Sequence, residues 1–150
     1  MLLRLSCFFV AFIFLCSFTN VDKSTNESKE LISSIEEDLK ILDLYKNFTS
    51  KNNSVPQLTC FTKAIKGYLK LKKNGKIKNE TLTVIDFSLS SSVKRLWVLD
   101  MISNKVVFNT VVAHGKNTGI EYASKFSNTN NSNQSSLGFY ITDKTYYGKN

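Results

Sequence analysis

Cysteine and histidine side chains in this chain could together carry out nucleophilic chemistry. The 150 residues include three cysteines, of which Cys7 and Cys16 lie in an apolar N-terminal run, and Cys60 is the third. His114 is the single histidine of the sequence. A thiolate attacks an acyl carbon when a neighbouring base takes its proton or a positive environment lowers its pKa. A paired Cys60 and His114 would therefore indicate acyl transfer through a covalent intermediate.

The positions of the two residues do not favour such a pair. Cys60 lies at the start of a helical pattern, whereas His114 follows a strand-like segment, and nothing in the spacing brings them together. Cysteine is among the most frequently buried residues, so a buried structural thiol is the preferred interpretation of Cys60. One histidine cannot build a zinc site, and the sequence has no P-loop or dinucleotide fingerprint. We expect no metal and no cofactor.

The N-terminus predicts an export signal over residues 1–19. Arg4 precedes the apolar run Leu5–Phe18, and small residues flank Phe18 before the chain becomes polar. Localisation to the periplasm or cell envelope follows from this prediction. A membrane anchor is the alternative, because the run approaches the lower length limit for a membrane span. Lipidation at Cys16 is disfavoured by the bulky residue before it. Signal removal would leave Cys60 alone and exclude an internal disulfide.

Lysine dominates the positive charge of the chain. The formal net charge is +8, and 18 of the 20 basic residues are lysines. Beyond the predicted signal, Arg95 is the single arginine, whereas proteins that read nucleic acids usually use arginine forks. We expect no nucleic-acid partner and no membrane contact except through the N-terminal signal or anchor. The lysine excess indicates either attraction to anionic envelope polymers or a compositional bias without function.

Two helices are expected before the strand-rich part of the chain. Apolar residues recur at steps of three and four over Glu27–Lys46, which predicts an amphipathic helix. This helix either docks on the domain or presents its apolar stripe to a partner protein. The polar segment Asn47–Val55 predicts a linker closed by Pro56. A second helix is expected over Gln57–Lys73, and its lysines form either an anion-binding face or a solvated face.

Strand patterns follow the second helix. Ser103-Asn-Lys105 predicts a tight turn between two of the strands, which should form an antiparallel hairpin with Trp97 packed inside the sheet. The segment Lys116–Ser136 lacks any period, so it is either disordered or a functional loop over a site. The four expected strands are Leu82–Phe87, Arg95–Asp100, Val106–Ala113 and Gly138–Thr142.

An ordered set of short motifs accompanies these elements. The motifs are Ala64-Ile-Lys-Gly-Tyr68, Val84-Ile-Asp-Phe-Ser88, Lys94-Arg-Leu-Trp-Val98, Val112-Ala-His-Gly-Lys-Asn-Thr-Gly119, Phe126-Ser-Asn128 and Gln134-Ser-Ser-Leu-Gly-Phe-Tyr-Ile-Thr142. In this order they resemble the opening portion of the murein L,D-transpeptidase catalytic-domain family, from Phe61 to the C-terminus. The resemblance implies an α+β, mainly β fold, in which N-terminal helices precede the first strands of an incomplete β-sandwich. Together with the N-terminal patterns, it predicts three parts: a signal (1–19), a helix with linker (20–56) and part of the catalytic domain (57–150).

The resemblance also implies a chemistry. Enzymes of this family use a cysteine thiolate to attack a peptidoglycan stem peptide, release a terminal D-amino acid and pass the acyl group to an amine of a second stem. Their histidine-glycine and serine-x-glycine-cysteine motifs follow the Ser135-Ser-Leu-Gly-Phe-Tyr140 element, and neither motif occurs between this element and Asn150. We therefore expect the catalytic cysteine and histidine to lie beyond Asn150.

The expected function is that of a fragment of an exported L,D-transpeptidase, with stem peptides as partners. Because no residue of this chain matches the catalytic motifs, the fragment should be inactive as given. The alternative is a non-catalytic module that binds peptidoglycan.

The substrate-binding residues implied by the resemblance are His114, Ser136 and Tyr140. His114 matches a position just after a strand that enters the site, where it would line the pocket or orient a loop. Its ring nitrogens would otherwise simply bond to nearby backbone. Ser135 and Ser136 either contact substrate amides or cap the turn before the last strand. An incomplete sandwich would expose an apolar face and a strand edge, so we expect marginal stability and dye binding or aggregation.

Overall fold

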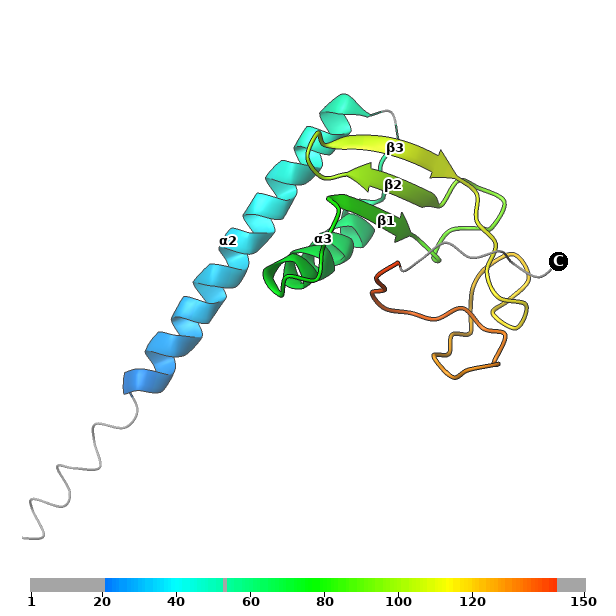
Figure 1. Ribbon diagram of the computed structural model, residues 1–150. Helices are drawn as coiled ribbons and strands as arrows, with labels where there is room; N and C mark the ends of the chain where they lie inside the picture. The colour runs from blue at the N-terminus through cyan, green and yellow to red at the C-terminus, as the bar shows by residue number, and fades with distance from the viewer. Residues whose placement is uncertain (1–20, 53, 143–150) are drawn as a thin grey trace, which may run out of the picture. The chain divides into compact units, whose positions relative to one another are not determined.

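A computed structural model describes residues 21–52 and 54–142 (Figure 1). The predicted export signal over residues 1–19 lies outside the described residues, and so does Asn150, beyond which the catalytic pair is expected. The chain divides into two compact units, residues 1–40 and 41–150. Within the described ranges, the helices are too short or too polar to cross a lipid bilayer.

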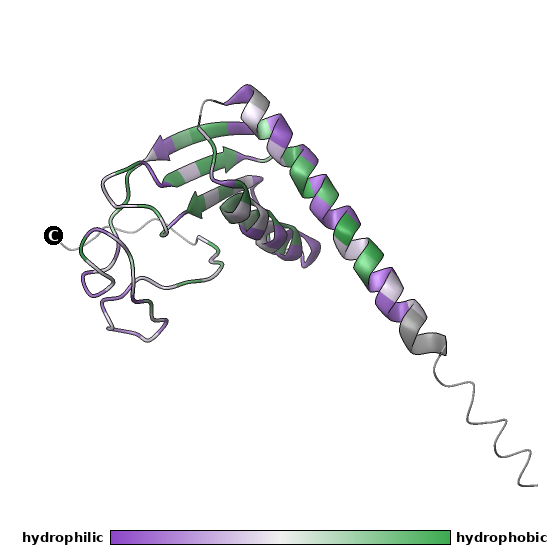
Figure 2. Ribbon diagram, turned by 180° about the vertical axis from the view of Figure 1, so that it is seen from behind, coloured by the Kyte–Doolittle hydropathy of each residue, from purple (hydrophilic) through white to green (hydrophobic). Residues whose placement is uncertain are grey.

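The first helix, α2 (Val21–Lys51), extends further than the sequence pattern predicted. Apolar and polar residues alternate along it (Figure 2), and Leu31, Ile35 and Leu39 are exposed in the first unit. In the second unit its C-terminal end is part of the core, where Phe48 is fully buried and packs edge-on against Phe61 at 5.4 Å. The predicted linker was wrong over residues 47–51, because burial of Phe48 outweighs the weak helix propensity of its polar neighbours.

The second helix, α3 (Leu58–Lys73), agrees closely with the prediction. Its buried face carries Phe61, Ile65 and Tyr68, which pack toward the sheet. The Asn74 backbone N–H donates to the carbonyl oxygen of Lys70, and Gly75 follows in the left-handed region with φ +67°. Glycine enters that region at little cost, so Asn74-Gly75 ends the helix as expected.

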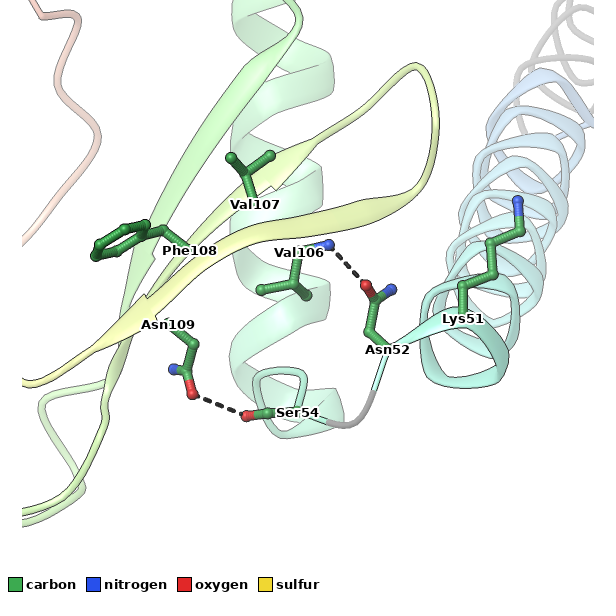
Figure 3. Close-up of a pocket in the computed structure, with 7 residues that line it drawn as sticks. All are labelled: Lys51, Asn52, Ser54, Val106, Val107, Phe108 and Asn109. Carbon is green, nitrogen blue, oxygen red and sulfur yellow. Dashed lines mark hydrogen bonds between the residues drawn. The ribbon is translucent and has the colours of Figure 1, made fainter.

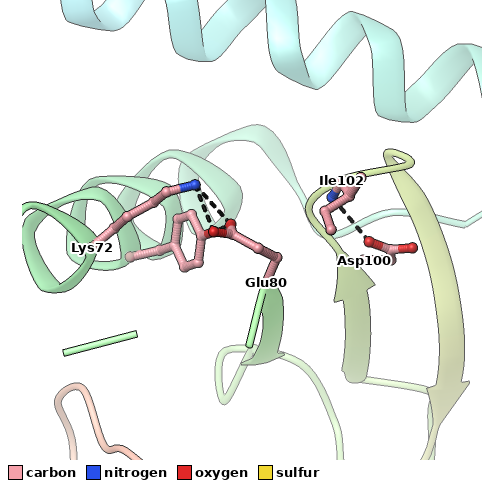
Figure 4. Close-up of polar contacts among 5 residues, drawn as sticks. Lys72, Glu80, Asp100 and Ile102 are labelled. Carbon is pink, nitrogen blue, oxygen red and sulfur yellow. Dashed lines mark hydrogen bonds and ion pairs between the residues drawn. The ribbon is translucent and has the colours of Figure 1, made fainter. Parts of the chain in front are cut away.

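The sheet has three antiparallel strands in the order β1 (Thr81–Ile85), β2 (Leu96–Asp100) and β3 (Lys105–Thr110). The predicted β2–β3 hairpin is confirmed, and Asn104 takes the left-handed conformation that its tight turn needs. Asp100 accepts hydrogen bonds from the Ser103 hydroxyl and the Ile102 N–H, which lower the pKa of its carboxyl group (Figure 4). Two helices followed by this sheet confirm the α+β class and agree with an incomplete β-sandwich.

A polar cluster joins the end of α3 to β1. Glu80 accepts hydrogen bonds from the Tyr68 hydroxyl and from Lys72 Nζ, the latter at 2.8 Å (Figure 4). The Lys72 ammonium group lowers the pKa of Glu80, while burial and the Glu80 carboxylate raise the pKa of Tyr68. This cluster fixes the direction in which the chain enters the sheet.

The two faces of the sheet differ in how they are covered. Val84, Trp97 and Leu99 face the helices and are buried, which confirms the expected position of Trp97. On the opposite face, Ile85 is 37% and Phe108 is 60% exposed. Phe108 pairs with half-buried Val98, so the exposed residues continue an apolar surface across the strands. The described residues therefore leave one apolar face of the sheet uncovered.

The fourth strand, expected over Gly138–Thr142, does not form. These residues have an irregular backbone and pair with none of the three strands that the structure describes. Phe139 instead lies against Gly67 of α3, where its ring occupies the space that a Cβ atom would need. The prediction of a fourth strand from the β-branched and aromatic content of this segment was wrong, and Phe139 contacts a helix instead.

Candidate functional site

The candidate site is the segment that follows β3, called here the His114 loop (residues 111–137). It is built on Arg95, the residue just before β2, whose side chain is fully buried. Arg95 Nη1 donates to the Leu89 carbonyl oxygen at 2.8 Å. Its Nε and Nη2 donate to the Val112 carbonyl oxygen at 3.1 and 2.9 Å. The guanidinium group therefore joins the turn after β1 to the beginning of the loop.

The charge of Arg95 is balanced in an unusual way. The guanidinium carbon lies 5.2 Å from the centre of the Phe87 ring, within the range of a cation–π interaction. No carboxylate of the described residues forms an ion pair with it. The guanidinium group is instead stabilised by two backbone carbonyl groups, the Phe87 ring and a nitrogen of His114. A buried charge needs such partners, so Arg95 can be buried only where the backbone supplies them.

His114 connects Arg95 to the far side of the loop. Its Nδ1 lies 2.8 Å from Arg95 Nη2, and its Nε2 lies 3.1 Å from the Gly119 carbonyl oxygen. The imidazole is half-buried. Both ring nitrogens are therefore engaged within the loop.

Thr118 is the centre of the loop and is fully buried. Its Oγ1 accepts a hydrogen bond from the Ser135 N–H at 2.7 Å, and its carbonyl oxygen accepts one from the Lys125 N–H at 3.0 Å. The Gly115 N–H donates to Ser135 Oγ at 2.9 Å. These bonds hold the two ends of the loop side by side, so it has a defined conformation and the disordered alternative is wrong.

Two glycines allow this close approach of backbone segments. A Cβ atom at Gly115 would lie 2.6 Å from the Asn133 carbonyl oxygen. A Cβ atom at Gly119 would overlap the Tyr122 carbonyl oxygen. Glycine at both positions is therefore needed for the close packing of this segment against neighbouring backbone.

Comparison with known proteins decides the family. A family model described as the L,D-transpeptidase catalytic domain matches residues 50–150. The chain belongs to this family. No curated protein and no solved structure matches the chain. The L,D-transpeptidase family comprises enzymes of peptidoglycan cross-linking that act on stem peptides.

The sequence-predicted site residues of this L,D-transpeptidase domain occupy different surroundings. His114 lies inside the loop network, whereas Ser136 is exposed and donates to the Ser127 carbonyl oxygen at 3.1 Å. Tyr140 is exposed and its hydroxyl donates to the Leu137 carbonyl oxygen at 3.2 Å. The bond between Gly115 and Ser135 brings the neighbours of His114 and Ser136 together. No hydrogen bond within the described ranges joins Tyr140 to either residue.

The sequence interpretation missed Arg95 and Thr118 as parts of the site. Arg95 had one usable signal, because it is the single arginine beyond the N-terminal run and begins a predicted strand. Thr118 carried no such signal, since a threonine in a polar loop is usually exposed. The structure adds both residues to those that hold the His114 loop in its conformation.

Cys60 lies in the first turn of α3 and is half-buried. Burial raises the pKa of its thiol from 9.0 to about 11, with a further contribution from the negative charge of Asp86. A catalytic thiol needs the opposite shift. The arrangement agrees with a structural thiol, and no group of three potential metal ligands occurs in the described part of the chain.

The position of the catalytic pair stays a prediction. The resemblance predicts its cysteine and histidine beyond Asn150, and Asn150 itself lies outside residues 21–52 and 54–142, which the structure describes. Within those ranges the sulfur of Cys60 and the imidazole of His114 form no hydrogen bond with each other.

A pocket of about 300 Å³ lies elsewhere in the domain, with Lys51, Asn52 and Ser54 on one side and β3 on the other (Figure 3). Asn52 Oδ1 accepts a hydrogen bond from the Val106 N–H at 2.8 Å, which covers part of the strand edge. Ser54 Oγ donates to Asn109 Oδ1 at 3.1 Å. Lys51 is the single ionisable residue that lines this pocket, and its Nζ donates to the Ser103 carbonyl oxygen at 3.5 Å.

Replacing Asn52 with alanine is expected to destabilise the domain by about 1–3 kcal/mol. The variant leaves the Val106 N–H without its partner and removes donors from the carbonyl oxygens of Phe48 and Asn104. Urea unfolding measures the change. The control is Asn128→Ala, because the exposed Asn128 side chain makes one hydrogen bond, to Leu137. Equal stability of the two variants would contradict the bridging role of Asn52.

Proposed function

We propose that this chain is the substrate-side scaffold of an exported L,D-transpeptidase that binds peptidoglycan stem peptides. The family match over residues 50–150 carries the proposal. The ordered His114 loop supports it, because a loop with a fixed backbone can present polar groups to an extended peptide with little loss of entropy on binding.

The exposed hydroxyl groups of Ser136 and Tyr140 are the proposed contacts to stem-peptide amides. Each hydroxyl is bonded to one backbone carbonyl and keeps further capacity for a ligand. His114 contributes through the shape of the loop. This proposal is tested by titrating ¹⁵N-labelled protein with a purified tetrapeptide muropeptide and following the amide chemical shifts by NMR. Ser136→Ala with Tyr140→Phe should weaken binding at least several-fold, while Thr129→Ala on the same loop should not. Binding that is unchanged in the double variant would exclude these contacts.

We further propose that the 150 residues alone do not catalyse transpeptidation. Cys60 is half-buried and protonated at neutral pH, and both ring nitrogens of His114 are bonded to groups other than its sulfur. Mass spectrometry of muropeptides incubated with the chain should show no loss of a terminal D-amino acid and no cross-linked product. Turnover that disappears in Cys60→Ala would overturn this proposal and make Cys60 the nucleophile.

The raised pKa of Cys60 predicts slow alkylation and a specific pH dependence. Iodoacetamide should label the folded chain much more slowly than the chain in urea at neutral pH, because the thiolate is the reacting species.

The folded thiol keeps its proton between pH 9.0 and about 11, where the unfolded thiol loses it. Cys60 therefore favours unfolding as the pH rises through this window. Cys60→Ala should reduce that loss of stability, measured by urea unfolding at each pH.

A second candidate function, a non-catalytic module that binds the cell envelope, is favoured by the outer face of α3. Residues 44–79 contain nine lysines and no aspartate or glutamate. Four of these lysines recur at helical spacing on the side of α3 away from Phe61 and Ile65, and all four are exposed. They are Lys63, Lys66, Lys70 and Lys73.

A charge-matched comparison tests this candidate. Changing the four α3 lysines to glutamine should reduce co-sedimentation with purified sacculi that carry anionic polymers, and added salt should reduce it further. The control variant changes four exposed lysines on other elements to glutamine and so has the same net charge. Equal binding by the two variants would attribute retention to total charge and remove the α3 face as a site. The control residues are Lys29, Lys40, Lys94 and Lys105, which lie outside the His114 loop.

Export is proposed from the N-terminal sequence. The apolar run and the small residues around Phe18 support cleavage after Thr19. Expression of the full chain in a bacterial host, followed by N-terminal sequencing of the envelope fraction, should give a protein that begins at Asn20. An intact N-terminus in the membrane fraction would favour the anchor.

A further inference from the structure

We propose that Arg95 is a positioning residue, which holds His114 in one neutral tautomer and through it fixes the His114 loop. The structural part of this proposal stands on the contacts of Arg95 and His114. Its relevance to substrate rests on the proposed function, since that function places stem peptides against the loop.

The tautomer follows from the hydrogen-bonding chemistry of arginine. A guanidinium group carries donors and no acceptor. Arg95 Nη2 lies 2.8 Å from His114 Nδ1, so Nδ1 must accept with its lone pair. The ring hydrogen is then on Nε2, which donates to the Gly119 carbonyl oxygen 3.1 Å away. A single donor contact thus defines the protonation pattern of the ring.

Arg95 can impose this pattern because its own position is fixed. Carbonyl oxygens of Leu89 and Val112 accept from three of its donor atoms, and Phe87 lies against the guanidinium group. Lysine offers a point charge on a flexible stem and cannot reproduce this planar set of bonds. Arginine is therefore needed for its geometry as well as for its charge.

The consequence for His114 is a role that excludes proton transfer. A general base needs a free nitrogen within reach of the substrate, and both nitrogens of this ring are occupied. The ring instead connects buried Arg95 to Gly119, the residue after Thr118. Because Thr118 binds the Ser135 N–H, the position of the ring is transmitted to the segment that carries Ser136.

The single histidine of the chain makes a direct test possible. A long-range ¹H–¹⁵N spectrum of the full 150-residue chain at neutral pH contains one imidazole, and it should show protonated Nε2 and unprotonated Nδ1. Arg95→Met should give a mixture of tautomers, and Arg95→Lys should not restore the single form. Lys94→Gln removes an adjacent exposed charge and should leave the spectrum unchanged. A wild-type spectrum with protonated Nδ1, or an unchanged spectrum in Arg95→Met, would overturn the proposal.

Hydrogen exchange supplies a second measurement that does not need a folded Arg95 variant. His114→Ala should increase exchange at the Gly115 and Ser135 amides by about tenfold, a change typical of losing one buried hydrogen bond. Amides of the β1–β2 pair should be unaffected. Unchanged protection at Gly115 and Ser135 would mean that the ring does not hold the loop. Neither the imidazole spectrum nor the hydrogen exchange depends on muropeptide binding. A failure of the proposed function can therefore be told apart from a failure of the role proposed for Arg95.

Discussion

Phe61→Ala is expected to lower the free energy of unfolding by about 3–5 kcal/mol, the range for truncating a fully buried phenylalanine. The Phe61 side chain has no exposed surface. Its ring contacts Tyr45 and Phe48 edge-on, with centroid distances of 5.1 and 5.4 Å. The substitution therefore removes the contact between the end of α2 and the start of α3 and leaves a cavity in the core.

Urea unfolding followed by circular dichroism measures this effect. Leu58→Ala is the matched control, because Leu58 lies one turn earlier on the same helix and is 40% exposed. We expect a loss below about 1 kcal/mol for the control, as is usual for a partly exposed position. Similar losses in the two variants would mean that the aromatic contacts do not hold the core together.

The second large effect is expected at Gly119. An added methyl group would overlap the backbone carbonyl of Tyr122, which cannot rotate away as a side chain can. Overpacking of this kind typically costs about 1–3 kcal/mol. Because the Gly119 carbonyl oxygen binds His114, Gly119→Ala should also alter the imidazole spectrum.

Gly67→Ala provides the contrast. The added methyl group would meet the end of the Phe139 ring, which can turn aside. Replacing a glycine inside a helix gains roughly 0.5–1 kcal/mol in helix stability. We expect a neutral or slightly stabilised protein whose Phe139 resonances shift, measured by unfolding and NMR. A Gly67→Ala protein that is as unstable as Gly119→Ala would contradict the distinction between side-chain and backbone contacts.

The elements that depend on local pattern were predictable from the sequence. Apolar residues at steps of three and four placed α3, and the period-two strands placed β1, β2 and β3 to within a few residues. The last turns of α2 were not predictable in this way. Asn47 and Thr49 favour a loop locally, and the burial of Phe48 that outweighs them depends on Phe61, which lies thirteen positions further along.

The candidate site was predictable only in part for the same reason. The family resemblance pointed to His114, Ser136 and Tyr140 but not to Arg95. Most arginines are exposed, and the burial of this one depends on carbonyl groups of Leu89 and Val112 that become neighbours only when the sheet has formed. Tertiary contacts of this kind leave no periodic trace in the sequence.

The indole of Trp97 gives the domain an internal optical reporter. Its Nε1–H donates to Ser54 Oγ at 3.2 Å, and Ser54 also bonds to Asn109 on β3. The sequence contains no second tryptophan. The emission wavelength therefore senses whether the segment after α2 stays on the sheet edge, so partial detachment of that segment can be followed in unlabelled protein before the core unfolds.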